Sequence, residues 1–338
     1  MTDAVQSADT VRPWIAIQTQ ALVRQRGHAW LLQGPSGLGQ YSLALSLVRA
    51  WLCEAPQDGI ACGTCASCHA IDVRTHADLI VLMPEIQMLQ LGWPLSEKAQ
   101  SEIDDKKRKP SKEIRVEAMR DAIEFAQRTS GRGRGKAVLV FPAEHMNTIA
   151  ANTLLKTLEE PPGQVKFVLA TESAHQLLPT IRSRCLGHVM HWPAQSESLA
   201  WLQAQGMDPA LAIQALKAAG GRPEDAFDFL QSGRDVAVWS NLRMALSKGD
   251  TSIFKDWSIP QVIDAMLKLC HDLMAVQAQS APRYLGEKSL GQSVQIAALS
   301  EWHRALVQAL RTAEHPFNGG LMLEALVSQA KNTLNSTN

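Results

Sequence analysis

The sequence has no excess charge of either sign and few aromatic residues. Lys and Arg together number 33, Asp and Glu together also number 33, and only two tyrosines occur in 338 residues. A chain without net positive charge lacks the long-range attraction for phosphate that proteins binding nucleic acid by themselves ordinarily have. A local basic surface is compatible with this balance, but the composition does not predict autonomous nucleic-acid binding.

Long hydrophobic runs are also lacking. No apolar stretch approaches the ~20 residues that a membrane-spanning helix requires, so we expect no membrane partner. The first ten residues are polar and slightly acidic, unlike a secretory signal. A hydrophobic content of 46% with 20% charged residues is typical of a globular protein, and 338 residues predict two or three domains.

Cysteine is scarce, but it is clustered. Of the six cysteines, four form the pattern Cys53-x8-Cys62-x2-Cys65-x2-Cys68. Thiolates at this spacing can share one tetrahedral zinc ion, and four of them leave no open position for water, so the zinc would be structural. The alternatives are four free thiols or two labile disulfides. A reducing cytoplasm, where we expect the protein to reside, disfavours disulfides.

A glycine-rich stretch follows the apolar run 29–32 and precedes a helix-like run at 43–48. It reads Gly34-Pro35-Ser36-Gly37-Leu38-Gly39-Gln40-Tyr41. Its glycines have the spacing of a P-loop, in which a turn and the start of a helix cradle phosphate. A chance glycine-rich turn is the alternative.

The residues that handle the nucleotide in a P-loop are replaced. Gln40 stands where the motif has Lys and offers no charge to the phosphates, and the phenol of Tyr41 stands where a small hydroxyl holds Mg²⁺. A strand expected at 137–141 is followed by Pro142 and Ala143, where an active nucleotide hydrolase has Asp and Glu; Glu144 comes two positions too late. We expect a degenerate P-loop that does not bind ATP productively, formed by Gly34, Gly37, Gly39, Gln40 and Tyr41.

Strands and helices alternate over 28–192, which predicts an α/β domain with a parallel sheet covered on both faces. Within it we expect 84–112 to be irregular and the charged run 104–110 to be a solvated loop. From about residue 194 strand signals vanish. Short helices are expected over 195–232 and longer ones beyond 236.

Two short motifs complete the pattern. The first is Leu154-Leu155-Lys156-Thr157-Leu158-Glu159-Glu160-Pro161-Pro162, a helix that the prolines end. Its two glutamates lie where the helix dipole disfavours negative charge, which indicates either an external cationic partner or simple solvent exposure. The second is Ser183-Arg184-Cys185.

The cysteine knuckle after the P-loop helix, these two motifs and the all-helical tail together resemble the bacterial clamp-loader family of AAA+ proteins, which belong to the DNA polymerase III holoenzyme. The resemblance covers nearly the whole chain. It implies a RecA-like AAA+ domain over 1–193 with the zinc knuckle inserted at 53–68, a small helical lid over 194–235 and a helical collar for oligomerisation over 236–338.

The resemblance also implies an assembly. Its ring contains ATPase subunits called gamma or tau and a delta subunit, and it opens the sliding clamp and places it on primed DNA for the polymerase, a nucleotidyltransferase. The replaced nucleotide residues agree with the member of this family that does not hydrolyse ATP.

The family assigns Arg184 a role in trans, as an arginine finger that reaches the ATP site of a neighbouring ATPase subunit. A guanidinium suits this role because it offers planar, permanently charged donors to the γ-phosphate. Arg182 is the rival candidate, and a surface or ion-paired arginine is the alternative.

Two other functions remain open at this point. The chain could be an ATP-hydrolysing gamma/tau-type subunit, which requires that the replacements at 40, 41, 142 and 143 are tolerated. It could also be an unrelated zinc-dependent nucleic-acid-binding module, which predicts autonomous DNA binding with a steep dependence on salt.

Overall fold

The computed structural model describes residues 12–232, 236–313 and 318–336, so the expectation about the first ten residues lies outside the described part. The chain divides into two compact units, 1–197 and 198–338. Each unit is described by itself below. In the described ranges, no helix combines the length and the apolar character that crossing a membrane requires.

The first unit is built on a five-stranded parallel sheet with the order β2-β3-β4-β1-β5. The strands are β1 (Ala29–Gln33), β2 (Leu79–Leu82), β3 (Lys136–Val140), β4 (Val165–Thr171) and β5 (Leu186–Val189). Every residue of β3 is buried, as expected for a strand covered on both faces. The predicted RecA-like α/β architecture is confirmed.

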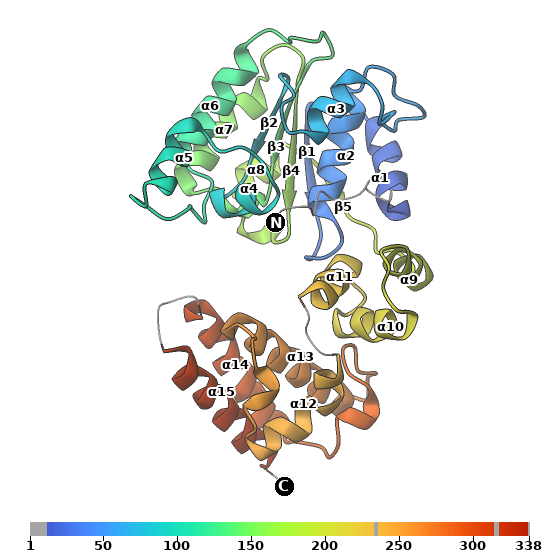
Figure 1. The fold of residues 1–338 in the computed structure, drawn as a ribbon, viewed down its shortest axis with the longest axis vertical. Helices are drawn as coiled ribbons and strands as arrows, with labels where there is room; N and C mark the ends of the chain where they lie inside the picture. The colour runs from blue at the N-terminus through green and yellow to red at the C-terminus, as the bar shows by residue number, and fades with distance from the viewer. Residues whose placement is uncertain (1–11, 233–235, 314–317, 337–338) are drawn as a thin grey trace. The chain divides into compact units, whose positions relative to one another are not determined.

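Helices cover both faces of this sheet, with α1 and α2 on one side and α6 and α7 on the other (Figure 1). The helices of the unit are α1 (Pro13–Val23), α2 (Gln40–Leu52), α3 (Ala66–Asp72), α4 (Glu85–Gln90), α5 (Glu97–Asp104), α6 (Val116–Gln127), α7 (Thr148–Glu159), α8 (Pro179–Arg182) and the start of α9 (Gln195–Ala204). Helix α7 begins after Asn147, whose side chain accepts a hydrogen bond from the Ala150 N–H, and it ends before the proline pair as predicted.

The prediction for 84–112 is wrong in part. The segment contains α4 and α5, and the side chain of Ser96 caps the start of α5. The charged run is not uniformly solvated either, because Arg108 forms ion pairs with Glu85 and Glu102. Residues 105–107 are exposed. Strand β5 is short and largely exposed at the edge of the sheet, which explains why hydrophobic patterning did not single it out.

The second unit is entirely helical in its described residues, as predicted. It contains most of α9, then α10 (Pro209–Ala218), α11 (Pro223–Gln231), α12 (Ala237–Lys248), α13 (Ile259–Gln277), α14 (Ile296–Thr312) and α15 (Gly319–Leu334). Helix α10 packs on α11, and α13 packs on α14. Met266, Cys270 and Trp302 are buried in the core of the longer helices. The division into lid and collar near residue 235 stays a prediction.

Candidate functional site

The glycine-rich loop connects β1 to α2, as a P-loop does. Gly37 and Gly39 have φ angles of 77° and 94°, in the left-handed region that glycine adopts without strain. Leu38 between them is fully buried, and its carbonyl accepts a hydrogen bond of 3.0 Å from Trp14 Nε1. The backbone shape predicted from the glycine spacing is therefore present.

Gln40 turns its side chain back onto this loop. Its Nε2 donates to the carbonyl oxygens of Gly34 at 2.7 Å and Pro35 at 2.5 Å, and the residue is 2% exposed. An amide NH₂ group has two hydrogens, and both are used on these carbonyls. The side chain that would reach toward phosphate in a working P-loop instead ties the loop to itself.

Tyr41 is covered by the segment 84–112. The indole Nε1 of Trp93 donates a 2.7 Å hydrogen bond to the Tyr41 hydroxyl, and the rings of Tyr41 and Phe141 lie 5.7 Å apart between centroids. The guanidinium carbon of Arg74 lies 4.6 Å from the centroid of the Trp93 ring. The sequence reasoning missed Trp93, whose only signal was a large aromatic residue in a polar segment.

The residues after β3 are Phe141, Pro142 and Ala143, where an active nucleotide hydrolase has its acidic pair. Pro142 and Ala143 lead into a short 3-10 helix, Ala143–His145. Glu144 Oε1 accepts a 2.9 Å hydrogen bond from the backbone N–H of Glu172, just after β4, so this carboxylate ties two loops together. Thr171, at the end of β4, is fully buried, and its hydroxyl accepts from the Ser173 N–H at 3.1 Å.

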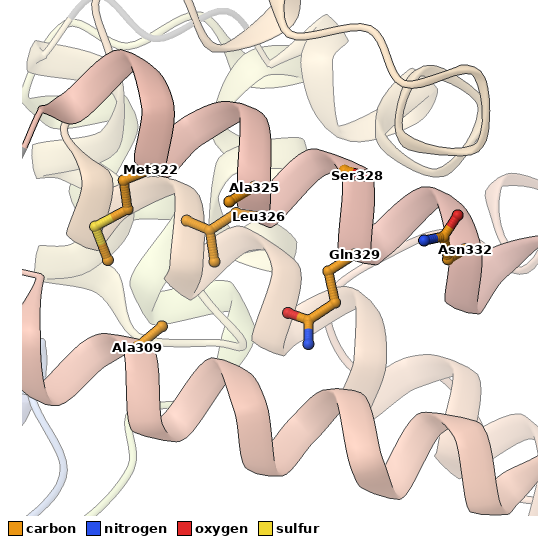
Figure 2. A pocket seen from close by; sticks show the side chains of 7 residues that line it. All are labelled: Ala309, Met322, Ala325, Leu326, Ser328, Gln329 and Asn332. Atoms are coloured by element: carbon orange, nitrogen blue, oxygen red, sulfur yellow. The ribbon is translucent and has the colours of Figure 1, made fainter.

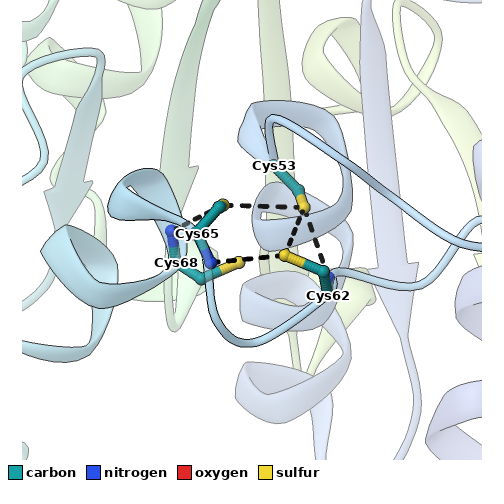
Figure 3. A group of neighbouring side chains, drawn as sticks. All are labelled: Cys53, Cys62, Cys65 and Cys68. Carbon is teal, nitrogen blue, oxygen red and sulfur yellow. Dashed lines mark hydrogen bonds between the residues drawn. The ribbon is translucent and has the colours of Figure 1, made fainter.

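The four clustered cysteines come together between α2 and α3 (Figure 3). Their sulfur atoms all lie within 4.8 Å of one another, with Cys53 Sγ 3.5 Å from Cys62 Sγ and 3.9 Å from Cys65 Sγ. Four thiolates around a tetrahedral zinc at ~2.3 Å would lie about 3.8 Å apart. The sulfur atoms are therefore close enough together to hold a tetrahedral metal ion.

Backbone N–H groups favour thiolates in this cluster. The Cys62 N–H donates to Cys53 Sγ at 3.3 Å, the Cys65 N–H to Cys62 Sγ at 3.4 Å, and the Cys68 N–H to Cys65 Sγ at 3.4 Å. Bonds from the backbone of Thr64 and Cys65 lower the pKa of Cys62 to about 6. Burial raises the pKa of Cys53 and that of Cys68. A bound cation would favour the charged form of all four thiols.

The knuckle is tied to the rest of the first unit through Glu54. Its Oε1 accepts from the Ser67 hydroxyl at 2.9 Å and from Arg132 Nη1 at 2.9 Å, and the hydrogen bond from Ser67 is the main cause that lowers the pKa of Glu54. The backbone N–H of Arg132 in turn donates to buried Asp78 at 2.8 Å. These contacts link the knuckle to the loop that precedes β3.

Arg184 follows α8 and is ion-paired in the isolated chain. Its Nε donates to Glu159 Oε1 at 2.6 Å, its Nη2 donates to the same oxygen, and its Nη1 donates to the Thr180 carbonyl at 2.8 Å. The Arg184 side chain is 32% exposed, whereas Arg182 is exposed. The cation beside Glu159 therefore comes from the same chain and not from an external partner, and the Glu159 side chain is also 47% exposed, as the alternative of solvent exposure predicted.

A groove in the second unit carries no titratable side chain. Met322, Leu326 and Gln329 of α15 point toward α14, which contributes Ala309 (Figure 2). Such a lining suits packing contacts, and among the lining residues the hydroxyl of Ser328 has no acid or base that could activate it. The residues that remain candidates for a functional site are therefore those of the first unit.

Residues 12–191 match the family described as "DNA polymerase III, delta subunit". The chain is 32% identical to DNA polymerase III subunit delta' of Pseudomonas aeruginosa over 327 residues, covering 90% of this chain and 92% of the relative. It is also 32% identical to subunit delta' of Escherichia coli over 296 residues, 81% of each.

Other matches are more partial. Subunit tau of Salmonella typhimurium is 35% identical over 159 residues, which cover 47% of this chain and 21% of that relative. A solved structure of a gamma subunit-related protein from Thermotoga maritima aligns with 95% of this chain and 100% of its own, with 16% identity and a TM-score of 0.49.

Proposed function

Because the chain belongs to the DNA polymerase III delta-prime family, we propose that it is a clamp-loader subunit that does not hydrolyse ATP itself and that completes the ATP site of a neighbouring subunit. Its partners would be gamma/tau-type ATPase subunits, a delta subunit, the sliding clamp and, as part of the assembly, primed DNA. Such an assembly works in the cytoplasm, where replication takes place.

The non-hydrolysing role is supported chiefly by the hydrogen bonds that Gln40 donates to the carbonyl groups of its own loop. Both of its amide hydrogens bond to loop carbonyls, so position 40 supplies neither the charge nor the reach of the P-loop lysine. Pro142 and Ala143 add a second defect in the acidic positions that would hold Mg²⁺ and activate water. One ATP site has thus lost two independent parts.

Equilibrium binding of Mg-ATP to the isolated protein tests this role. We expect no saturable binding in the micromolar range and no turnover, while a gamma/tau-type ATPase in the same assay serves as the positive control. Micromolar affinity accompanied by hydrolysis would favour the alternative, an ATP-hydrolysing subunit, over the proposed one.

The position of Arg184 supports action on another subunit's nucleotide. All strands are parallel, so the P-loop follows the carboxyl end of β1 while Arg184 precedes the amino end of the neighbouring strand β5. Leu186, two residues after Arg184, pairs with Trp30, four residues before Gly34. At about 3.3 Å per residue, Gly34 lies roughly 13 Å along the sheet from that pair. Arg184 is thus remote from its own P-loop.

The finger role is tested with Arg184→Ala in a reconstituted loader. We expect normal assembly and a loss of about tenfold or more in DNA-dependent ATP turnover, because a charge that stabilises the transferring phosphoryl group is removed. Arg182→Ala is the matched control, since Arg182 is an exposed arginine two residues earlier, and it should leave turnover unchanged. A correctly assembled Arg184→Ala complex with full turnover would refute the role.

We also propose that the cysteine cluster binds zinc as a structural ion. The thiolate spacing suits a four-sulfur shell, and such a closed shell has no position for substrate. The remaining alternative, an autonomous zinc-dependent DNA-binding module, is separated by titrating salt against binding of the isolated chain to primed DNA. Steep salt dependence of tight binding by the chain alone would support that alternative.

A further inference from the structure

The geometry points to Glu159 as the residue that positions Arg184 for its task in trans. This inference rests on the proposed finger role. It gives the last residue of α7 a function in the neighbour's ATP turnover, although Glu159 itself would contact neither nucleotide nor metal.

The ion pair holds the guanidinium in a defined orientation. Nε and Nη2 of Arg184 both donate to Glu159 Oε1, and Nη1 donates to the Thr180 carbonyl. Nη1 also donates to the Ser183 hydroxyl at 3.5 Å. A guanidinium has five N–H donors in one plane, and these contacts leave one donor on Nη2, which can reach a phosphate oxygen.

The carboxylate is itself held in place by the fold. Leu158, the preceding residue, is 1% exposed in the core, and its carbonyl accepts a 2.8 Å hydrogen bond from His28 Nε2 at the start of β1. This bond fastens the last turn of α7 to the residue before β1, one position before Glu159. Glu159 therefore presents its carboxylate from a fixed point.

Arg184 also explains why a glutamate is tolerated at this end of a helix. The helix dipole is negative at the C-terminus and disfavours a carboxylate there, and the guanidinium offsets this cost. In return, the flexible arginine side chain loses its conformational freedom when the subunit folds and not when a neighbour docks. Glu159 also neutralises part of the Arg184 charge, which would oppose the chemical step. This opposing effect should be smaller than the benefit of holding Arg184 in place beforehand, because an exposed ion pair is only weakly attractive.

The test uses the reconstituted loader and separates kcat from KM for ATP. We expect Glu159→Ala to lower kcat severalfold with little change in KM, because nucleotide binding is left intact and the finger is less ordered. Glu159→Gln should retain most of the activity, because its amide oxygen can accept the same hydrogen bonds. Glu160→Ala is the control, since Glu160 is the exposed neighbour, and it should behave like the unsubstituted protein.

A double-variant cycle shows whether Glu159 acts through Arg184. In the Arg184→Ala background, Glu159→Ala should have no further effect on kcat. Additive losses, or a higher kcat for Glu159→Ala alone, would overturn the inference. If Arg184→Ala has an effect and Glu159→Ala has none, only the positioning role fails; if Arg184→Ala has no effect, the finger role fails as well.

If the Glu159→Ala protein does not fold, the inference can still be tested with Glu159→Asp. Glu159→Asp keeps the charge but withdraws it by one methylene group, so it should lower kcat more than Glu159→Gln does. The reverse order would show that charge and not orientation matters, which would also overturn the inference.

Discussion

Gln40 and Arg184 both donate several hydrogen bonds within their own chain, but with different consequences. The neutral amide of Gln40 has no donor left after bonding to Gly34 and Pro35. The guanidinium of Arg184 keeps one donor on Nη2 while Glu159, Thr180 and Ser183 accept its other hydrogen bonds. At the scale of single residues, the amide donors of Gln40 are used within its own loop, whereas the guanidinium of Arg184 retains a donor.

Tyr41 provides a test, at the scale of one residue, of the contact by which the segment 84–112 covers the glycine-rich loop. Tyr41→Phe removes the hydroxyl that accepts from Trp93 Nε1 and leaves an indole N–H on a side chain that is 7% exposed. A buried donor without its partner costs about 1–3 kcal/mol. We therefore expect hydrogen exchange to show that the free energy of local opening in 84–112 falls by about 1–3 kcal/mol. Tyr284→Phe, in the second unit, should leave this segment unchanged; an equal loss there would contradict the assignment.

At the scale of elements, the knuckle and the segment 84–112 are held by different chemistry. The knuckle depends on four sulfurs that lie within 4.8 Å of one another. The segment 84–112 depends on Trp93 and on the ion pairs of Arg108, whose Nη1 lies 2.5 Å from Glu85 Oε2. Removing a metal should therefore loosen the first element, and removing charge should loosen the second.

For the knuckle, we expect one zinc ion per chain by elemental analysis, and its loss in Cys65→Ser. The hydroxyl of serine is a far weaker ligand for zinc than a thiolate. Cys185→Ala is the matched control, because Cys185 lies outside the cluster, and it should retain the metal. A metal-free protein with a normally protected knuckle would contradict the zinc assignment.

For the segment 84–112, Arg108→Ala should reduce the stability against local opening by about 1–2 kcal/mol, since it leaves the Glu85 carboxylate without its main partner. Hydrogen exchange over 85–111 measures this loss. Lys107→Ala is the control, because the side chains of Lys107 and Asp105 in its ion pair are 67% and 52% exposed, and such pairs contribute at most about 1 kcal/mol. Equal effects of the two substitutions would show that the Arg108 ion pairs stabilise the segment no more than an exposed pair does.

The same ion pair makes the segment sensitive to acid. The hydrogen bond from Arg108 lowers the pKa of Glu85 below its ordinary value of 4.5. A carboxyl group whose pKa is lower when folded contributes its stability above the ordinary value and loses it as the pH falls through the folded pKa. Protection of 85–111 should therefore be constant from neutral pH down to about 4.5 and decrease below it. In Glu85→Gln this dependence should be weaker.

At the scale of the whole molecule, the chain consists of two compact units with separate cores. Leu158 is 1% exposed in the first, and Leu269 is fully buried in the second. Separate cores predict that a cavity in one unit lowers the stability of that unit alone.

Leu158→Ala and Leu269→Ala form a matched pair for this prediction. Each should cost about 2–5 kcal/mol, the usual range for such truncations in a core, and hydrogen exchange should increase only in the unit that carries the substitution. Uniform loss of protection over the whole chain would show that the two units unfold together.

Local chemistry explains what the sequence alone could predict. Glycine spacing predicts the loop at 34–39, because φ angles such as the 94° of Gly39 select glycine. Continuous apolar runs predict the buried strands, and the Cys-x2-Cys spacing predicts the cluster that the structure assembles. The defects at positions 40, 41, 142 and 143 were likewise visible from residue type alone.

Only the tertiary structure decided which distant residues meet. Trp93 meets Tyr41 across 52 positions, and Glu159 meets Arg184 across 25, contacts that no local pattern encodes. The exposed strand β5 and the helices of 84–112 escaped prediction because their packing partners lie elsewhere in the chain. The sequence by itself determined that Gln40 and Tyr41 replace the lysine and the small hydroxyl of a P-loop, and it predicted the cysteine cluster. The fold decided that Arg184 and the P-loop lie at opposite ends of the neighbouring parallel strands β5 and β1, which are separated by the length of a strand.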